Sequence, residues 1–131
     1  MESMIPDLSL CFEKASQEMG VHKKLLVVVA YVESRLNEKA FNLNRNGTYD
    51  IGIMQINSSN IPKLRKKGII QEERDLWNAC KNIRAGAYIM NECIDAYGFN
   101  WKAVDCYNKG DRARYVSQYV WKVYSILEKV R

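Results

Sequence analysis

The chain has 131 residues, a length that suits a single domain over residues 1–131 with one hydrophobic core. Hydrophobic residues make up 47% and charged residues 27%, a composition that excludes an intrinsically disordered chain. The net charge of +5 favours polyanionic partners, but its densest patch, at Lys63, Arg65, Lys66 and Lys67, is short, so we expect a solvated surface there and no nucleic-acid site.

Two helices are predicted in the first third of the chain. Asp7 is suited to cap the first, which Gly20 ends, because residues 8–19 carry apolar side chains at helical spacing. The second is predicted over residues 23–36, where the run 25–32 is apolar on all sides and indicates a buried helix. A strand is the alternative there, because the run contains four valines.

Residues 37–50 are rich in turn formers, and Asn46-Gly47 within them is a strong hairpin signal. We expect a loop with a short β-turn ribbon here, and a return to ordered structure over residues 52–57. A short helix is predicted over residues 58–67, interrupted at Pro62 and ended by Gly68.

The rest of the chain predicts three more helices, so the class is mostly α. A long helix is expected over about residues 76–96, a short one capped by Asn100 over residues 101–108, and a last one over about residues 111–129. The apolar stripe of the last helix is expected to comprise Ala113, Val116, Val120, Val123 and Leu127.

The four cysteines lack the spacing of a metal site, and the single histidine, His22, lies far from all of them in sequence. Zinc is therefore not expected, and two disulfides formed in an oxidising compartment are. Cys80 and Cys93 fall on one predicted helix about 20 Å apart, too far to bond to each other. Two connectivities remain, Cys11–Cys80 with Cys93–Cys106 or Cys11–Cys93 with Cys80–Cys106, and we favour the first.

No membrane span is expected, since the longest apolar run has eight residues and a spanning helix needs about 20. The N-terminus, from Met1 to Met4, lacks a charged segment followed by an apolar one. Either the chain is not exported, or a signal peptide has been removed from it.

Glu33 is unusual because it follows eight apolar residues at the end of the helix predicted to be most buried. Burying a carboxylate is costly unless it is paired or neutral, and burial raises its pKa toward the range that a general acid needs near neutral pH. The alternative is that Glu33 turns to solvent at the helix end and pairs with Arg35 or Lys39.

A second carboxylate, Asp50, follows on the polar loop. A buried glutamate facing a carboxylate on a polar loop is the arrangement of a glycosidase, in which one group stays protonated and the other ionised. Gly52 has no side chain and is expected to let the backbone pass close to a sugar. Gln55 and Asn57 carry amides that suit sugar hydroxyl and acetamido groups.

Four separated blocks follow one another in a recognisable order. They are Cys11-Phe12-x-Lys14-Ala15, Glu33-Ser34 with Asn37, Asn44-x-Asn46-Gly47-x-x-Asp50-x-Gly52-x-x-Gln55-Ile56-Asn57-Ser58, and Trp101-x-Ala103-Val104-x-x-Tyr107-Asn108-x-Gly110. On these blocks the chain resembles the lysozyme-like lytic transglycosylases, most of all the small specialised ones of type III secretion, conjugation and pilus machines. The resemblance implies a mostly α, lysozyme-like (α+β) domain with a short β-turn ribbon. Its cysteines match Cys11 and Cys80, which supports the favoured pairing.

The resemblance also implies roles for single residues. Glu33 matches the catalytic acid and base, and Ser34 matches the residue that helps to orient it. Met54 matches a groove-lining contact and Gln55 an active-site amide. Tyr107 matches the tyrosine that hydrogen-bonds the catalytic glutamate.

Asn108 is the neighbour of that tyrosine in the same turn, while Cys106 and Lys109 depart from the small residues usual in the family. The spacing from Glu33 to Asp50 also resembles animal c-type lysozymes, whose second carboxylate lies at that place. Asp50 therefore either stabilises positive charge in the transition state or only holds the β-turn through hydrogen bonds of its own.

The activity that the resemblance implies is cleavage of the β-1,4 bond between N-acetylmuramic acid and N-acetylglucosamine in peptidoglycan, with closure of a 1,6-anhydro ring and without a metal or cofactor. Hydrolysis by Glu33 and Asp50, as in a lysozyme, is one alternative, and a weakly active peptidoglycan-binding scaffold is another. The expected partners are peptidoglycan strands and a component of a secretion or pilus system. The expected location is the periplasm.

Overall fold

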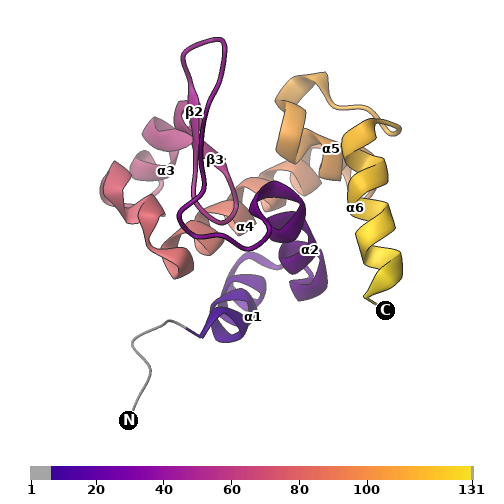
Figure 1. Ribbon diagram of the computed structural model, residues 1–131, viewed down its shortest axis with the longest axis horizontal. Helices are drawn as coiled ribbons and strands as arrows, with labels where there is room; N and C mark the ends of the chain where they lie inside the picture. Colours follow the sequence, from indigo (N-terminus) through magenta and orange to yellow (C-terminus); the bar gives the residue numbers. More distant parts are fainter. Residues whose placement is uncertain (1–6, 131) are drawn as a thin grey trace.

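The computed structural model describes residues 7–130, which form six α-helices, three short 3₁₀ helices and one small antiparallel sheet. Residues 1–6, which include the N-terminal segment without a signal-peptide pattern, lie outside the described part. Figure 1 shows the β-hairpin on one side of the molecule, α5 and α6 on the other, and α4 between them. A groove lies between the hairpin and α5, lined by residues of both.

The first two helices form as predicted. Helix α1 spans Leu8–Met19, with the Asp7 carboxylate accepting the backbone N–H of Leu10 at 3.3 Å and Gly20 ending the helix in the left-handed region. Helix α2 spans Lys23–Ser34, which excludes the strand alternative. It ends two residues earlier than predicted, because Arg35 and Leu36 both adopt left-handed backbone angles.

Strands β1 (Phe41–Leu43), β2 (Tyr49–Ile51) and β3 (Ile56–Asn57) pair in the order β1-β2-β3 and supply the predicted ribbon. In register, Asp50 lies opposite Asn42 on one side and Asn57 on the other, so these three polar side chains share one face of the sheet. The opposite face carries Phe41 and Tyr49.

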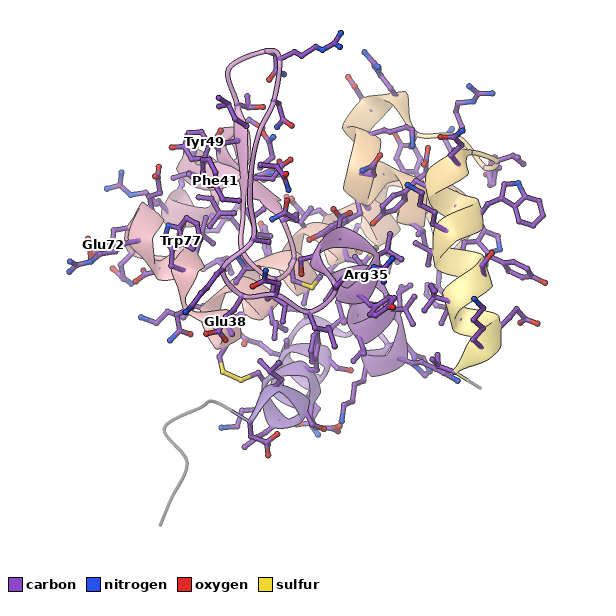
Figure 2. All side chains as sticks on the ribbon, viewed as in Figure 1. Arg35, Glu38, Phe41, Tyr49, Glu72 and Trp77 are labelled. Atoms are coloured by element: carbon purple, nitrogen blue, oxygen red, sulfur yellow. A yellow bond between two sulfur atoms is a disulfide. The ribbon has the colours of Figure 1, made fainter. Side chains whose placement is uncertain are left out.

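The aromatic face of the sheet points away from α5 (Figure 2). The ring of Phe41 stacks on Trp77 with centroids 6.0 Å apart and lies 5.6 Å from the ring of Tyr49. Strand alternation therefore separates a polar face, which borders the groove, from an aromatic one on the outside.

The middle of the chain starts with η1 (Ser58–Asn60) and α3 (Ile61–Lys66), followed by η2 (Glu73–Trp77) and the long α4 (Ala79–Tyr97). Pro62 lies in the first turn of α3, where its missing N–H costs nothing, so it begins this helix rather than interrupting it.

The last part differs most from the prediction. After α5 (Trp101–Lys109) and η3 (Gly110–Arg112), helix α6 spans only Gln118–Lys129, with Ser117 as its cap. Ala113 and Val116 precede it, and Val116 is 63% exposed instead of part of an apolar stripe. The segment 113–117 does not continue as a helix because it wraps around the buried Asp105, which accepts hydrogen bonds from the Arg114 backbone and the Ser117 hydroxyl.

The core forms where α2 and α4 meet the sheet. Leu26, Val29 and Ala30 of α2 are fully buried, as the apolar run predicts. Gly86 of α4 allows close contact with Met54, since a Cβ there would lie 2.7 Å from the Met54 Cε. Among residues 7–130, no helix is both long and apolar enough to cross a membrane.

Two disulfides fix α4 to its neighbours. Cys11–Cys80 ties its first turn to α1, and Cys93–Cys106 ties its later part to α5. The favoured pairing of the cysteines is confirmed. Each bridge removes conformations from the unfolded chain and stabilises the domain by about 2–4 kcal/mol.

Asn82 of α4 joins the helical part to the sheet. Its side chain is fully buried and donates to the carbonyl groups of Ile51 at 2.9 Å and Leu76 at 2.8 Å. Its amide oxygen accepts the backbone N–H of Met54 at 2.9 Å. A buried amide with all these partners fixes the segment between β2 and β3, which borders the groove.

We predict that Asn82→Ala lowers the free energy of unfolding by about 3 kcal/mol or more, because three buried backbone groups lose their partner. Urea denaturation followed by circular dichroism measures this loss. Asn91→Ala, the same change later in α4 at a partly exposed position, is the control and should cost much less. Equal costs for the two variants would contradict the role given to Asn82.

Candidate active site

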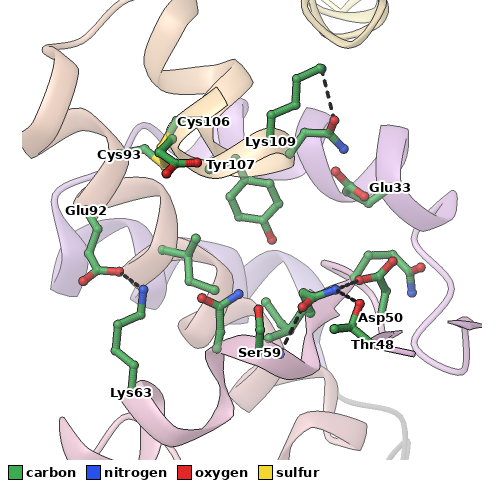
Figure 3. Close-up of a pocket in the computed structure, with 18 of the residues that line it drawn as sticks. Glu33, Thr48, Asp50, Ser59, Lys63, Glu92, Cys93, Cys106, Tyr107 and Lys109 are labelled. Atoms are coloured by element: carbon green, nitrogen blue, oxygen red, sulfur yellow. Dashed lines mark hydrogen bonds and ion pairs between the residues drawn. A yellow bond between two sulfur atoms is a disulfide. The ribbon is translucent and has the colours of Figure 1, made fainter. Parts of the chain in front are cut away.

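A groove with a volume of about 740 Å³ lies between the sheet and α5. Figure 3 shows Glu33 and Asp50 at one end of it beside Tyr107, and the ion pair of Lys63 with Glu92 at the other end. The lining is mostly polar and rich in amide side chains, namely Asn44, Asn46, Gln55, Asn57, Asn60 and Asn108. Such a lining suits a long, uncharged, oxygen-rich ligand.

Glu33 lies in the last turn of α2, half-buried, with its carboxylate on the groove. Burial raises its pKa from the ordinary value of 4.5 to about 7. The hydrogen bond from Tyr119 lowers the pKa, the negative charge of Asp50 raises it, and the ammonium groups of Lys122 and Lys109 lower it. Glu33 is therefore divided between its protonated and ionised forms near neutral pH.

Tyr119 holds the Glu33 carboxylate. Its hydroxyl donates to Glu33 Oε2 at 2.7 Å, and its ring is buried in the first turn of α6. Burial, together with the charge of Glu33, raises the pKa of Tyr119 well above its ordinary value, so the hydroxyl keeps its proton. The sequence offers no local signal for this contact, because Tyr119 is one of two tyrosines on α6 and nothing in the residue pattern distinguishes them.

Tyr107 lines the groove, but its predicted hydrogen bond to Glu33 is wrong. Its hydroxyl donates to the backbone carbonyl of Met54 at 2.7 Å, and Tyr119 makes the bond to Glu33 instead. Burial, with the charges of Glu33 and Asp50, raises the pKa of Tyr107 well above its ordinary value. Tyr107 therefore braces the segment between β2 and β3 from the α5 side.

Asp50 is the central residue of β2 and faces the groove from the sheet. Its carboxylate accepts from the Asn57 side-chain amide at 2.9 Å. The turn itself is held by Asn44, Asn46 and Thr48, with the Thr48 N–H donating to Asn46 at 3.0 Å and the Asn44 N–H to the Thr48 carbonyl at 2.8 Å. The turn thus has hydrogen bonds of its own, and Asp50 is connected to it through Asn57, whose amide also donates to Thr48 at 3.1 Å.

Gln55 lines the groove in a fixed orientation. Its amide nitrogen donates to the Gly52 carbonyl at 3.0 Å, and its oxygen accepts from Asn42 at 2.6 Å. Asn57 also lines the groove and caps η1 by accepting the Ser59 N–H at 3.0 Å. Both amides line the groove, in which the sequence predicts them.

Gly52 has a role other than the predicted one. Its φ is +78°, and a Cβ there would lie 2.8 Å from the Leu76 carbonyl and against Asn82. The missing side chain therefore makes room for packing against α4 and η2, away from the groove.

Two other predicted residues, Ser34 and Met54, form hydrogen bonds that involve the backbone of the segment between β2 and β3. Ser34 donates to the Ile53 carbonyl at 2.7 Å and so joins the end of α2, next to Glu33, to the segment between β2 and β3. The Met54 side chain is fully buried against Gly86, so the prediction that it lines the groove is wrong. Met54 contributes only its backbone, which bonds to Tyr107 and Asn82.

The far side of the groove is formed by the end of α5. Asn108 lines it and accepts from Lys109 at 3.2 Å, while Lys109 forms an ion pair with Asp105 at 2.7 Å. In the part of the chain that the structure describes, no three His, Cys, Asp or Glu side chains gather as a metal site. The groove brings together a glutamic acid of raised pKa, the Asp50 carboxylate and several amide side chains.

We predict that Tyr119→Phe raises the pKa of Glu33 above about 7, because the lost hydroxyl donates to the ionised form of the carboxylate. A ¹³C NMR titration of the Glu33 carboxyl measures the shift. Tyr124→Phe, which lies on the exposed side of the same helix, is the control and should leave the titration unchanged. A fall in the Glu33 pKa would contradict the assignment of this hydrogen bond.

Comparison with known proteins identifies the family. The model of the Transglycosylase SLT domain matches residues 10–124. The invasion protein IagB of Salmonella typhi is 34% identical over 127 residues, covering 92% of this chain and 78% of the relative. A peptidoglycan-binding-like protein of Escherichia coli O157:H7 is 34% identical over 131 residues, covering 93% and 78%.

A shorter match links the chain to protein IpgF of Shigella flexneri, which is 38% identical over 100 residues, covering 76% of this chain and 65% of the relative. The resemblance to lytic transglycosylases drawn from the four sequence blocks is confirmed by these matches. The chain belongs to the transglycosylase SLT domain family, and its mostly α architecture with a small sheet is the lysozyme-like fold of that family.

Proposed function

We propose that the chain is a peptidoglycan lytic transglycosylase that cuts the β-1,4 bond between N-acetylmuramic acid and N-acetylglucosamine. The observation that carries the proposal is the state of Glu33, whose pKa is raised to about 7 in an amide-lined groove of a transglycosylase-family domain. A carboxyl group with this pKa can give a proton and take one back within one turnover near neutral pH.

Glu33 acts first as the acid. Its proton passes to the oxygen that links the two sugars, and the bond from that oxygen to the anomeric carbon of the muramic acid breaks. Positive charge develops at the anomeric carbon. The acetamido group of the same sugar stabilises this charge. The Asp50 carboxylate also stabilises it, from the sheet side of the groove.

Glu33 then acts as the base. The ionised carboxylate, which Tyr119 stabilises by its hydrogen bond, takes the proton from the C6 hydroxyl of the muramic acid. The C6 oxygen bonds to the anomeric carbon and closes a 1,6-anhydro ring. The proton count balances, since Glu33 ends as it began and no water is consumed.

Lysozyme-type hydrolysis is the second candidate, and the position of Asp50 favours it. A carboxylate on the sheet that faces a raised-pKa glutamate is the pair that hydrolysing glycosidases use. The two reactions differ only in whether water or the C6 hydroxyl attacks the anomeric carbon. Their products therefore distinguish them, because hydrolysis leaves a new reducing end and ring closure does not.

The setting of the activity belongs to the same proposal. Two disulfides indicate an oxidising compartment, which for an enzyme acting on peptidoglycan is the periplasm. We propose that the single SLT domain over residues 1–131 opens the cell wall locally for a secretion or pilus apparatus. The support for this last point is the similarity to an invasion protein.

We predict that Glu33→Gln lowers the release of muropeptides from purified sacculi by about 100-fold or more, because proton transfer by a positioned acid contributes about 10²–10⁴ in rate. Mass spectrometry of the released muropeptides should show 1,6-anhydro ends for the unmodified protein. Glu38→Gln, outside the groove lining, is the control and should keep full activity. Full activity of Glu33→Gln would refute the mechanism. If the unmodified protein releases only muropeptides with reducing ends, the reaction is hydrolysis and not ring closure.

We predict that Asp50→Asn lowers the rate by about 10- to 100-fold through lost charge stabilisation, while the fraction of anhydro ends stays the same. The same change should lower the pKa of Glu33, because the Asp50 charge raises that pKa in the unmodified protein. The alkaline limb of the pH–rate profile should therefore move to lower pH. An unchanged profile and rate would leave Asp50 without a part in the reaction.

A further inference from the structure

Among the buried residues of the described chain, Asp105 is the one with a charged side chain. It lies on α5 and its side chain is fully removed from solvent, although it belongs neither to the groove lining nor to the apolar core. A buried carboxylate is costly unless several donors satisfy it, and an apolar residue of similar size would pack at lower cost. Packing alone therefore does not explain why this position carries a charged side chain.

Three donors converge on the Asp105 carboxylate. Lys109 Nζ donates to Oδ1 at 2.7 Å, the Ser117 hydroxyl to Oδ1 at 2.6 Å, and the Arg114 backbone N–H to Oδ2 at 2.8 Å. Burial works against the charged form, yet these hydrogen bonds hold the pKa of Asp105 below its ordinary value. Asp105 is thus an ionised anchor for the segment that connects α5 to α6.

The anchor determines where α6 begins. Ser117 donates to Asp105 and at the same time caps α6 by accepting the Val120 N–H at 3.0 Å. Tyr119 follows two residues after Ser117 in the first turn of this helix and donates to Glu33 at 2.7 Å. On the other side, the Cys93–Cys106 bridge beside Asp105 fixes α5 to α4.

We propose that Asp105 is a positioning residue, which holds the start of α6 through Ser117 so that the Tyr119 hydroxyl reaches the Glu33 carboxylate. The inference deepens the proposed function and rests on it for any effect on the rate. Its effect on Glu33 itself needs no activity and can be measured alone.

The direction of the Glu33 pKa shift separates positioning from simple electrostatics. The groups that act on Glu33 are Tyr119 and Lys122 of α6, Lys109 of α5 and Asp50 of β2. If Asp105→Asn displaces the Tyr119 hydroxyl, Glu33 loses a donor to its ionised form and its pKa rises. If Asp105 acts only through its charge, the same variant removes a negative charge and exposes Glu33 to Lys109, so the pKa falls.

The experiment compares the full-length variants Asp105→Asn, Tyr119→Phe and their combination by ¹³C NMR titration of Glu33 and by kinetics on soluble glycan strands. We expect Asp105→Asn to raise the Glu33 pKa and to lower kcat by about 10- to 100-fold with KM changed about twofold or less. In the Tyr119→Phe background Asp105→Asn should cause no further rise of the pKa and little further loss of kcat. Asp95→Asn, an exposed carboxylate of α4, is the control.

A fall of the Glu33 pKa in Asp105→Asn, or a loss of kcat that is equally large with and without the Tyr119 hydroxyl, would overturn the proposal. Should Asp105→Asn not fold, Ser117→Ala removes the link to α6 but keeps Asp105 and Lys109, and it must then raise the Glu33 pKa in the same way. An unchanged Glu33 pKa in Ser117→Ala would also overturn the proposal. If the pKa shifts appear but no variant or parent protein acts on glycan, the positioning stands and the proposed function fails.

Discussion

The hydrogen bond from the Tyr119 hydroxyl to Glu33 joins two residues that lie 86 positions apart in the chain. Burial alone would raise the Glu33 pKa further and make the group a weaker acid, which gives up its proton less readily. The tyrosine favours the ionised form and brings the balance to a pKa of about 7. The contact joins the end of α2, where Glu33 lies, to the start of α6, where Tyr119 lies.

Local signals account for the parts of the fold that the sequence predicts. Helices α1, α2 and α5 have apolar side chains at helical spacing, and α1 and α5 also have capping residues at their N-termini, so their predicted ends are correct to within two positions. The predicted start of α6 is seven residues too early, because apolar residues at helical spacing continue through Ala113 and Val116. The observed start follows Ser117, which caps the helix and donates to Asp105, a contact that the spacing of apolar residues does not predict.

The sequence predicts the residues of the site that have unusual chemistry, but it does not predict which contacts the side chains make in the folded chain. Glu33 is conspicuous as an acid after an apolar run, and Asp50 and Gln55 lie beside it as expected. The contacts predicted for Met54 and Tyr107 are wrong. The Met54 side chain lies in the core against Gly86, and the next residue, Gln55, has a left-handed backbone with φ of 52°, neither of which could be read from residue types.

The division of the sheet into a polar and an aromatic face has a consequence for how the chain can vary. Because neighbouring strand residues alternate between faces, inserting or deleting one residue inside β2 would exchange Asp50 for Tyr49 at the groove wall. The turn at 44–48 lies beyond the paired residues and can change length without this exchange. Changes of length in this hairpin should therefore be tolerated better at its tip than inside its strands, while Asn44 and Asn46 of the tip remain part of the groove lining.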